Sequence, residues 1–345
     1  MRTKMTALTL VFTTVLCVAP FANAGQDASN VIPTNLLGVT TSIAPPLGFD
    51  PLTAPDEELA AYGFPPRPDA ESTPEAYASW ARAMAASKER VLPRLRATNI
   101  FHGPNRRQLA RPVDEGTGTS SNWSGPVVFS GATSYNNTTS FWEISTEYVV
   151  PVAEQAFGVC NKAWDYGSAW VGIDGDGSND VLQAGVEFDA SCSPPTAPSY
   201  SAWYEWFPYS ETQVTNLPVS AGDDMLVIVW ATSATSGHAY IVNYNTKKLV
   251  TLNFTAPPGT SLVGNCAEWI VERPGVNGAL ATLTNYIATY FSAGYAYNNV
   301  PGNQYVPGSP GATLYTMLDN NGKPISFPTL LGTTAIWFQD EGSAW

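Results

Sequence analysis

The sequence contains few charged residues, and basic residues are the scarcest of them. Only 13% of its 345 residues are Asp, Glu, Lys or Arg, and the formal net charge is −13. Residues 1–118 hold 11 basic and 11 acidic groups, whereas residues 119–345 hold 5 basic and 18 acidic groups. Such an acidic surface argues against nucleic acid or an anionic membrane as a partner. It suits a protein that works at low pH, although acidic solubility alone would also explain it.

The sequence also lacks an apolar run that is long enough to cross a membrane. Its most apolar stretch, from about residue 7 to residue 19, follows Arg2 and Lys4 and precedes the small residues Ala22-Asn23-Ala24. A short apolar run between basic residues and a small-residue cleavage site is typical of a secretory signal, and its length argues against a membrane anchor. We therefore expect residues 1–24 to be a signal peptide and the protein to be secreted.

Cysteine and histidine are scarce, which limits metal chemistry. Cys17 belongs to the predicted signal peptide. In an exported chain Cys160 and Cys192 are predicted to form a disulfide, and Cys266 is the odd thiol. Three cysteines and His238 do not make a zinc cluster, so we expect no metal and no other cofactor.

Residues 25–118 differ in composition from the rest of the chain. They are rich in Pro, Gly and Ala and irregular up to about residue 70. A helix is then predicted from about 73 to 92, with Thr73 as its N-cap and Pro74 in its first turn. A basic run follows: Arg94, Arg96, Arg106, Arg107 and Arg111. We interpret 25–118 as a propeptide that docks on the acidic part at neutral pH and loosens as carboxylates become protonated. A linker without a regulatory role is the alternative.

From about residue 119, short apolar and aromatic segments alternate with clusters of Gly, Asn, Ser and Pro. The expected strands are 127–130, 140–150, 168–172, 181–188, 201–207, 225–231, 238–243, 248–254, 267–272, 279–291 and 335–339. No helical pattern and no tandem repeat interrupts them. Many short strands at roughly even spacing predict an all-β sandwich or barrel over 119–345.

Three of the expected strands place acid or amide groups on one face. Because side chains alternate along a strand, Gln183 and Glu187 share a face, and so do Glu268 and Glu272. Glu205 occupies a similar position on a third strand. Carboxylates within strands this apolar need partners or acquire a raised pKa, which prepares a carboxyl group for acid–base catalysis. For each strand alone, a solvated outer face of a sheet is the alternative.

These segments resemble the glutamic peptidases, or eqolisins, which are secreted, pepstatin-insensitive acid proteases of fungi with bacterial relatives. The resemblance covers about 121–291 and is carried by SNWSG at 121–125, AWVGIDGD at 169–176, LQAGV at 182–186, AWYEWFP at 202–208 and AEWIVE at 267–272. It implies a sandwich of two curved antiparallel sheets, of the concanavalin A-like or jelly-roll type, with the active site on the concave face.

The resemblance implies that Gln183 and Glu272 form the catalytic pair. The positions that it implies to line or support the cleft are Trp123, Trp170, Asp174, Glu187, Glu205 and Glu268. Glu187 stands where the fungal enzymes have an aspartate. Gly177 and Ser178 stand where the family has a cysteine, so Cys266, which lies near the usual partner of that cysteine, is predicted to be free. The region from about 295 to 345 matches no part of the family pattern.

We therefore expect a monomeric acid endopeptidase that acts on protein or peptide substrates and is inhibited by its own propeptide. We expect self-cleavage on acidification to remove residues up to about 116–121. A serine triad is poorly supported, because His238 is the only histidine after the propeptide and no G-x-S-x-G motif is present. A glycoside hydrolase or a lectin-like sugar-binding sandwich remains the alternative, since carboxylates and tryptophans on a concave sheet also bind sugars.

Overall fold

The computed structural model describes residues 30–86, 89–104, 116–156, 163–191, 197–300 and 303–342. Strands dominate this part of the chain, and almost all pairs are antiparallel. The longer strands are β7 (Trp123–Phe129), β8 (Glu143–Val149), β10 (Ser168–Ile173), β11 (Val181–Ser191), β12 (Ser199–Phe207), β14 (Asp224–Ser233), β15 (Ser236–Asn243), β16 (Lys248–Thr255), β17 (Cys266–Glu272), β20 (Ala288–Tyr297), β22 (Thr313–Leu318), β23 (Pro324–Leu330) and β24 (Ile336–Asp340).

The shorter strands lie mostly in the N-terminal segment and at the edges of the sheets. They are β1 (Val31–Pro33), β2 (Thr40–Ser42), β3 (Glu89–Arg90), β4 (Leu95–Ala97), β5 (Ile100–Phe101), β6 (Thr117–Ser120), β9 (Trp164–Asp165), β13 (Thr212–Val214), β18 (Gly275–Val276), β19 (Ala279–Leu280) and β21 (Gln304–Tyr305). The described helices are α1 (Asp56–Ala61) and α2 (Pro74–Ala86).

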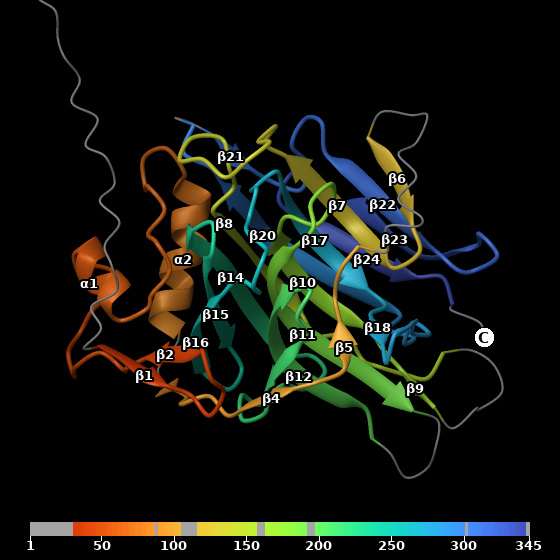
Figure 1. Ribbon diagram of the computed structural model, residues 1–345, viewed down its shortest axis with the longest axis horizontal. Helices are drawn as coiled ribbons and strands as arrows, with labels where there is room; N and C mark the ends of the chain where they lie inside the picture. The colour runs from red at the N-terminus through yellow and green to blue at the C-terminus, as the bar shows by residue number, and fades with distance from the viewer. Residues whose placement is uncertain are drawn as a thin grey trace, which may run out of the picture.

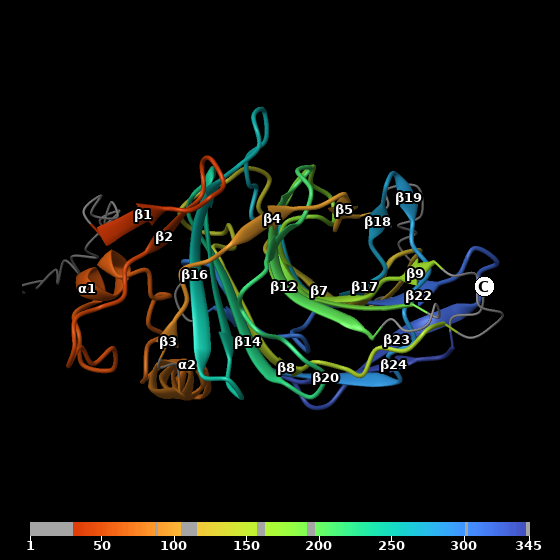
Figure 2. The same cartoon turned by 90° about the horizontal axis from the view of Figure 1, so that it is seen from below.

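The strands form two layers, which confirms the predicted all-β sandwich. Hydrogen-bonded neighbours follow the order β13-β12-β11-β10-β17-β7-β22 in the inner layer and β16-β15-β14-β8-β20-β24-β23 in the outer layer. The β22–β23 pair joins the two layers at one side. Figure 2 shows the inner layer strongly curved, with its concave side turned away from the outer layer. This curvature creates the surface on which the polar side chains gather.

The alternation predicted for residues 181–188 is confirmed. Leu182, Ala184, Val186 and Phe188 of β11 are fully buried in the core between the layers. They pack there with core residues from both layers, among them Val171, Val227, Ile241 and Trp269. The intervening residues of β11 therefore point to the concave face, since successive side chains of a strand point in opposite directions.

Two predicted elements have the wrong extent. The strand predicted at 279–291 is divided, because β19 ends at Leu280 and β20 begins at Ala288. Ile287 just before β20 has φ 59°, a left-handed conformation that a β-branched residue rarely adopts and that interrupts regular strand geometry. The helix predicted to run to 92 ends at Ala86, and residues 89–90 pair instead with β16 as strand β3.

The N-terminal segment, residues 30–104, wraps around the sandwich. Its helices pack on the outer face of β14–β16 through Leu59, Trp80 and Met84, which cluster with Ile228 and Tyr240. Strands β2 and β3 pair with β16, and β4 pairs with β13, so both layers gain strands at their edges. From β4 the chain continues to β5, across the open side of the curved inner layer (Figures 1 and 2). None of the described helices could span a membrane.

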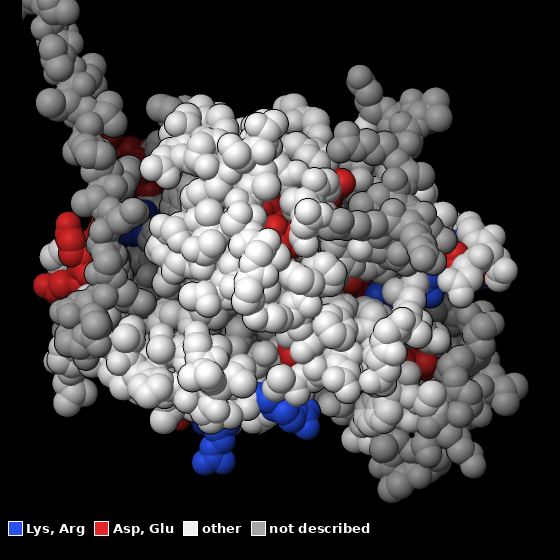
Figure 3. Space-filling model, in the orientation of Figure 1, with Lys and Arg blue, Asp and Glu red and all other residues white. Residues whose placement is uncertain are grey.

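Within the basic run predicted to dock this segment, Arg96 donates a hydrogen bond to the side-chain oxygen of Gln213 on β13. Arg94 and Arg96 are exposed and take part in no ion pair within the described ranges. Figure 3 shows basic atoms at the lower edge of this face, near β4, and others toward its left and right sides. Arg106, Arg107 and Arg111 lie outside the described residues. A basic residue outside that run, Arg82 of α2, forms an ion pair with Glu147 of β8.

Candidate active site

Five neighbouring strands of the inner layer, β12, β11, β10, β17 and β7, present polar side chains on its concave face. Their register aligns three rows in this strand order: Glu205, Gln183, Gly172, Glu268 and Val127; then Trp203, Gly185, Trp170 and Ile270; then Ser201, Glu187, Ser168, Glu272 and Trp123. The polar positions that the sequence places on separate strands thus share one continuous surface. An aromatic row lies between the row of Gln183 and the row of Glu272.

The N-terminal segment crosses this surface between two supports. On one side, the Thr98 N–H donates to the Glu211 carbonyl at 3.0 Å, and the Glu211 N–H donates to the Ile100 carbonyl at 2.9 Å. On the other side, β5 pairs with β18. Gln183 and Glu272 are fully buried in this arrangement. The concave face is therefore occupied by the chain itself.

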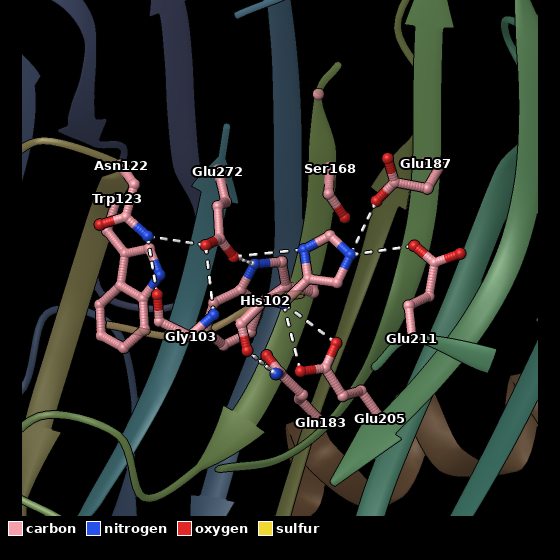
Figure 4. A network of polar contacts seen from close by, with 12 residues as sticks. His102, Gly103, Asn122, Trp123, Ser168, Gln183, Glu187, Glu205, Glu211 and Glu272 are labelled. Atoms are coloured by element: carbon pink, nitrogen blue, oxygen red, sulfur yellow. Dashed lines mark hydrogen bonds and ion pairs between the residues drawn. The ribbon is translucent and has the colours of Figure 1, made fainter. Parts of the chain in front are cut away.

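His102, which follows β5, fills the centre of the concave face (Figure 4). Its ring stacks on Trp203 with the ring centres 4.0 Å apart and the planes 10° apart. Nε2 lies 3.0 Å from a carboxylate oxygen of Glu187 and 3.0 Å from one of Glu211, and its hydrogen-bond geometry favours Glu211. Nδ1 lies 3.3 Å from Glu272 Oε2. One imidazole is thus surrounded by three carboxyl groups.

The backbone of His102 is bound by two side chains of the concave face. Its N–H donates to both carboxylate oxygens of Glu205, at 3.0 and 3.2 Å. Its carbonyl oxygen accepts a hydrogen bond from Nε2 of Gln183. The amide of Gln183 therefore points its donor at a peptide carbonyl, which is the role an oxyanion donor has to fill.

The backbone of Gly103 is bound in the same way by two others. Its N–H donates to Glu272 Oε1 at 3.3 Å, and its carbonyl accepts from the Asn122 side-chain amide at 2.8 Å. Backbone groups buried away from a sheet need such partners. Together with the contact of Gln183, these bonds place Gln183 and Glu272 at the carbonyl and the nitrogen of a single peptide link, His102–Gly103.

Glu272 is the most densely bonded carboxylate of the site. Oε1 also accepts from the Asn122 amide at 2.7 Å, and Oε2 accepts from the indole N–H of Trp170 at 2.8 Å. Burial raises the pKa of Glu272, while the contacts with His102, Asn122 and Gly103 oppose this rise. The carboxylate is held in one orientation and is positioned to take up a proton.

Charge in the cluster is balanced by the imidazole. Burial alone would lower the pKa of His102, but the charge of Glu187 and the bonds to Glu187, Glu211 and Glu272 outweigh it and raise this pKa well above its ordinary value. Burial and the charge of Glu187 raise the pKa of Glu211 to about 7, although His102 opposes the rise. Burial likewise raises the pKa of Glu205 well above its usual range. At neutral pH His102 is therefore a cation among glutamates.

His102, Glu187 and Glu211 are also close enough to share a metal ion. Nε2 of His102 lies 3.0 Å from an oxygen of each glutamate, and only the contact with Glu211 has the geometry of a hydrogen bond. A coordinated zinc would need each donor about 2 Å from the metal and the donors spread around it. Donor atoms this close to one another are compatible with hydrogen bonding and with ligation alike, and the absence of a metal stays a prediction.

Asp174 and Glu268 lie at the far end of the surface and do not contact the His102–Gly103 link. Asp174 accepts from the N–H groups of Val263 and Asn265 at 2.6 and 2.8 Å and so fixes the loop before β17. Glu268 accepts from the Asp176 N–H at 3.0 Å. Both carboxyl groups therefore hold the loops next to β10 and β17 in place and do not bind the His102–Gly103 link.

The remaining predicted residues divide between the site and the undescribed ranges. Trp123 packs edge-on against Trp170, with the ring centres 5.4 Å apart, and so supports the indole that binds Glu272. Cys266 is a free buried thiol, as predicted. The predicted disulfide partners Cys160 and Cys192 lie outside the described residues.

Sequence reasoning missed three residues of the site, namely His102, Asn122 and Glu211. His102 lies in the segment interpreted as removable, so it did not enter the search for chemistry. Asn122 is part of the motif at 121–125, but nothing in the sequence shows that its amide reaches Glu272. Glu211 precedes β13, a three-residue strand that was not predicted. The signal that the sequence does offer is the apolar pair Ile100-Phe101 directly before His102 in the N-terminal segment.

Comparison with known proteins agrees with this geometry. Residues 121–336 match the model of the Peptidase A4 family. The chain is 35% identical over 188 residues to aspergillopepsin-2 of Aspergillus niger, a match that covers 50% of this chain and 63% of that protein. It is 32% identical over 178 residues to scytalidopepsin B of Scytalidium lignicola, covering 51% and 59%. The chain therefore spans less than two thirds of the length of these curated relatives.

A solved structure shows the same relationship. The chain resembles the crystal structure of scytalido-glutamic peptidase with a transition state analog inhibitor, with a TM-score of 0.53 and 26% identity. The match covers 64% of this chain and 98% of that chain. The match thus includes almost all of that chain and leaves about a third of this chain without a counterpart in that structure.

Proposed function

The chain belongs to the Peptidase A4 family, and on this premise we propose that it is an acid endopeptidase in which Gln183 and Glu272 form the catalytic pair. One observation supports this assignment above the others. The Gln183 amide donates to the carbonyl of a peptide link whose N–H donates to Glu272. An amide donor at the carbonyl and a carboxylate at the nitrogen are the two groups that hydrolysis without a metal or a covalent intermediate requires.

In the proposed mechanism Glu272 begins as a carboxylate and takes a proton from a water molecule as that water attacks the scissile carbonyl. The Gln183 N–H groups stabilise the negative charge that develops on the carbonyl oxygen. Glu272 then passes its proton to the leaving nitrogen, and the carbon–nitrogen bond breaks. The products are a carboxylic acid and an amine, and both side chains return to their starting state. Asn122 and Trp170 keep the carboxylate of Glu272 in place throughout.

The form described here corresponds, in this proposal, to the zymogen. The N-terminal segment occupies the concave face, so a second peptide cannot bind there until the segment moves. Acidification weakens the attachment, because Glu211, which is bonded to Nε2 of His102, loses its charge as it becomes protonated. We also propose that the protein is secreted behind a signal peptide, is monomeric and is insensitive to pepstatin.

We expect the acidified protein to hydrolyse acid-denatured haemoglobin in the presence of pepstatin and to release no sugar from β-glucans. The reason is that the pair opposed across the peptide link is an amide and a carboxylate, whereas a glycosidase places two carboxyl groups at its centre. Release of acid-soluble peptides and of reducing sugar would be measured in parallel. Sugar release without proteolysis would overturn the proposed function and favour the carbohydrate alternative.

A further inference from the structure

We propose that the His102–Gly103 peptide bond is the first bond cut during activation, and that the cut is made within the same molecule. This inference rests on the proposed function of Gln183 and Glu272. It places the first cleavage well before the junction near 116–121 that the sequence predicts. It follows from how the segment is bound and not from its composition.

The segment is bound as a substrate would be. The four backbone polar groups of residues 102 and 103 are all satisfied by side chains of the concave face: Glu205, Gln183, Glu272 and Asn122. A peptide whose main-chain groups are all bound in this way is positioned by the cleft through its backbone. The link between the two residues is the one at which both proposed catalytic groups act.

The side-chain positions on either side of the link fit these two residues. His102 fills the space between Trp203, Glu187 and Glu211 and is fully buried. A Cβ atom on Gly103 would lie 2.8 Å from the ring of Phe207, so this position has room only for glycine unless the ring moves. The cleft therefore holds an imidazole before the bond and a residue without a side chain after it.

The cut forms and breaks the bonds of an ordinary hydrolysis. A water oxygen bonds to the carbonyl carbon of His102, the bond from that carbon to the Gly103 nitrogen breaks, and the water proton reaches that nitrogen through Glu272. The new ends are a carboxyl group on His102 and an amine on Gly103. In the docked state His102 Nδ1 shields Oε2 of Glu272, so the imidazole has to shift before a water molecule can meet both catalytic groups.

Acidification allows the imidazole of His102 to shift. The groups that face His102 are Glu187 from β11, Glu205 from β12, Glu211 before β13 and Glu272 from β17. As Glu211, which bonds to Nε2, becomes protonated, its pull on the imidazolium weakens, while Glu272 stays ionised and the hydrogen bonds from the Gln183 and Asn122 amides to the segment remain. The link thus stays in the cleft when the ring is loosened.

The test is to acidify the purified full-length precursor to pH about 3–4 and to follow new chain ends by mass spectrometry over time. We expect the first new N-terminus to be Gly103, paired with a fragment that ends at His102. The rate should not change when the protein is diluted, since the reaction is intramolecular. Asn99→Ala, an exposed position of the same segment, is the matched control and should be cut at the wild-type rate.

Gly103→Ala should slow cleavage at this bond by about tenfold or more, because the added Cβ would lie 2.8 Å from the ring of Phe207 and displace the link from the proposed catalytic pair. A first cut elsewhere, with proteolysis of denatured haemoglobin intact, would overturn this inference and leave the proposed function standing. Loss of haemoglobin hydrolysis in the wild-type protein would instead remove the function. A cut at His102–Gly103 that speeds up with protein concentration would contradict the intramolecular step.

A cut at this bond should leave the N-terminal fragment attached. The fragment is held by strand pairing of β2 and β3 with β16 and of β4 with β13, and by the apolar cluster around Trp80. Neither kind of contact depends on pH. We expect the two fragments to co-elute in size-exclusion chromatography at pH about 4 and to separate only in denaturant. Separate elution in the absence of denaturant would contradict this expectation.

Discussion

Glu272→Gln is expected to lower the rate of peptide hydrolysis at pH about 3–4 by about 10³-fold or more and to leave the fold unchanged. The new side chain has the same shape but cannot accept a proton from water. Both oxygens of Glu272 accept hydrogen bonds, from Asn122 and Gly103 on one and from Trp170 on the other. An amide must turn its NH₂ toward one of these donors, so we also expect the free energy of unfolding to fall by about 1–3 kcal/mol.

Gln183→Ala should cost about 10²–10³-fold in kcat, because one oxyanion donor is removed. Gln183→Glu is the informative companion, since a carboxyl group can donate a hydrogen bond only while it is protonated. We expect this variant to retain part of the activity at the lowest pH and to lose it as the pH rises. The measurement is kcat for a soluble peptide against pH in all variants. Equal turnover in wild type and Glu272→Gln, or a Gln183→Glu profile of wild-type shape, would contradict the assignment.

The matched control for Glu272→Gln is Glu143→Gln. Glu143 is also a buried glutamate on a strand, β8, but it lies beneath helix α2, beside Ser79 and Trp80. The same substitution there should leave peptide hydrolysis by the activated enzyme within a factor of about two of the wild-type rate. If both variants lost activity, the loss would reflect damage to buried glutamates in general and not the chemistry of Glu272.

The sequence predicted which face of a strand each side chain occupies better than it predicted which strands lie side by side. Alternation along residues 181–188 correctly divides the core side chains from Gln183 and Glu187, because period two follows from the geometry of a single strand. That Glu272 aligns with Glu187 through Ser168 depends on the register of β11, β10 and β17, which no single strand encodes. The pairing of Gln183 with Glu272 came from the family resemblance and not from periodicity.

His102 shows most clearly what could not be predicted. It is separated by 81 positions from Gln183 and by more than that from Glu272, and its place depends on how β4 and β5 join the edges of two sheets. Such long-range placement follows from the complete fold. Strand β24 agrees with the strand predicted at 335–339, whereas β23 was missed because Pro324 and Pro328 weaken its strand pattern, since proline removes a donor from the ladder.

Glu143→Gln is expected to stabilise the precursor at neutral pH and to have little effect at pH 4. Burial raises the pKa of Glu143 from its ordinary value of 4.5 to about 8. An acid whose folded pKa is raised contributes its full stability below the unfolded pKa and loses it as the pH rises toward the folded pKa. At pH 7 the native protein must keep this group protonated, at a cost of about 3 kcal/mol relative to a side chain that is always neutral.

Glutamine is neutral at every pH and has the shape of the protonated acid, so it removes this cost. The free energy of unfolding of Glu143→Gln should therefore exceed that of the wild type by up to about 3 kcal/mol at pH 7, and the two should converge as the pH falls to 4. Urea denaturation of both precursors at the two pH values measures the difference. A gain of equal size at pH 4 and pH 7 would contradict this prediction. It would show that the packing of the glutamine, and not the ionisation of Glu143, stabilises the variant.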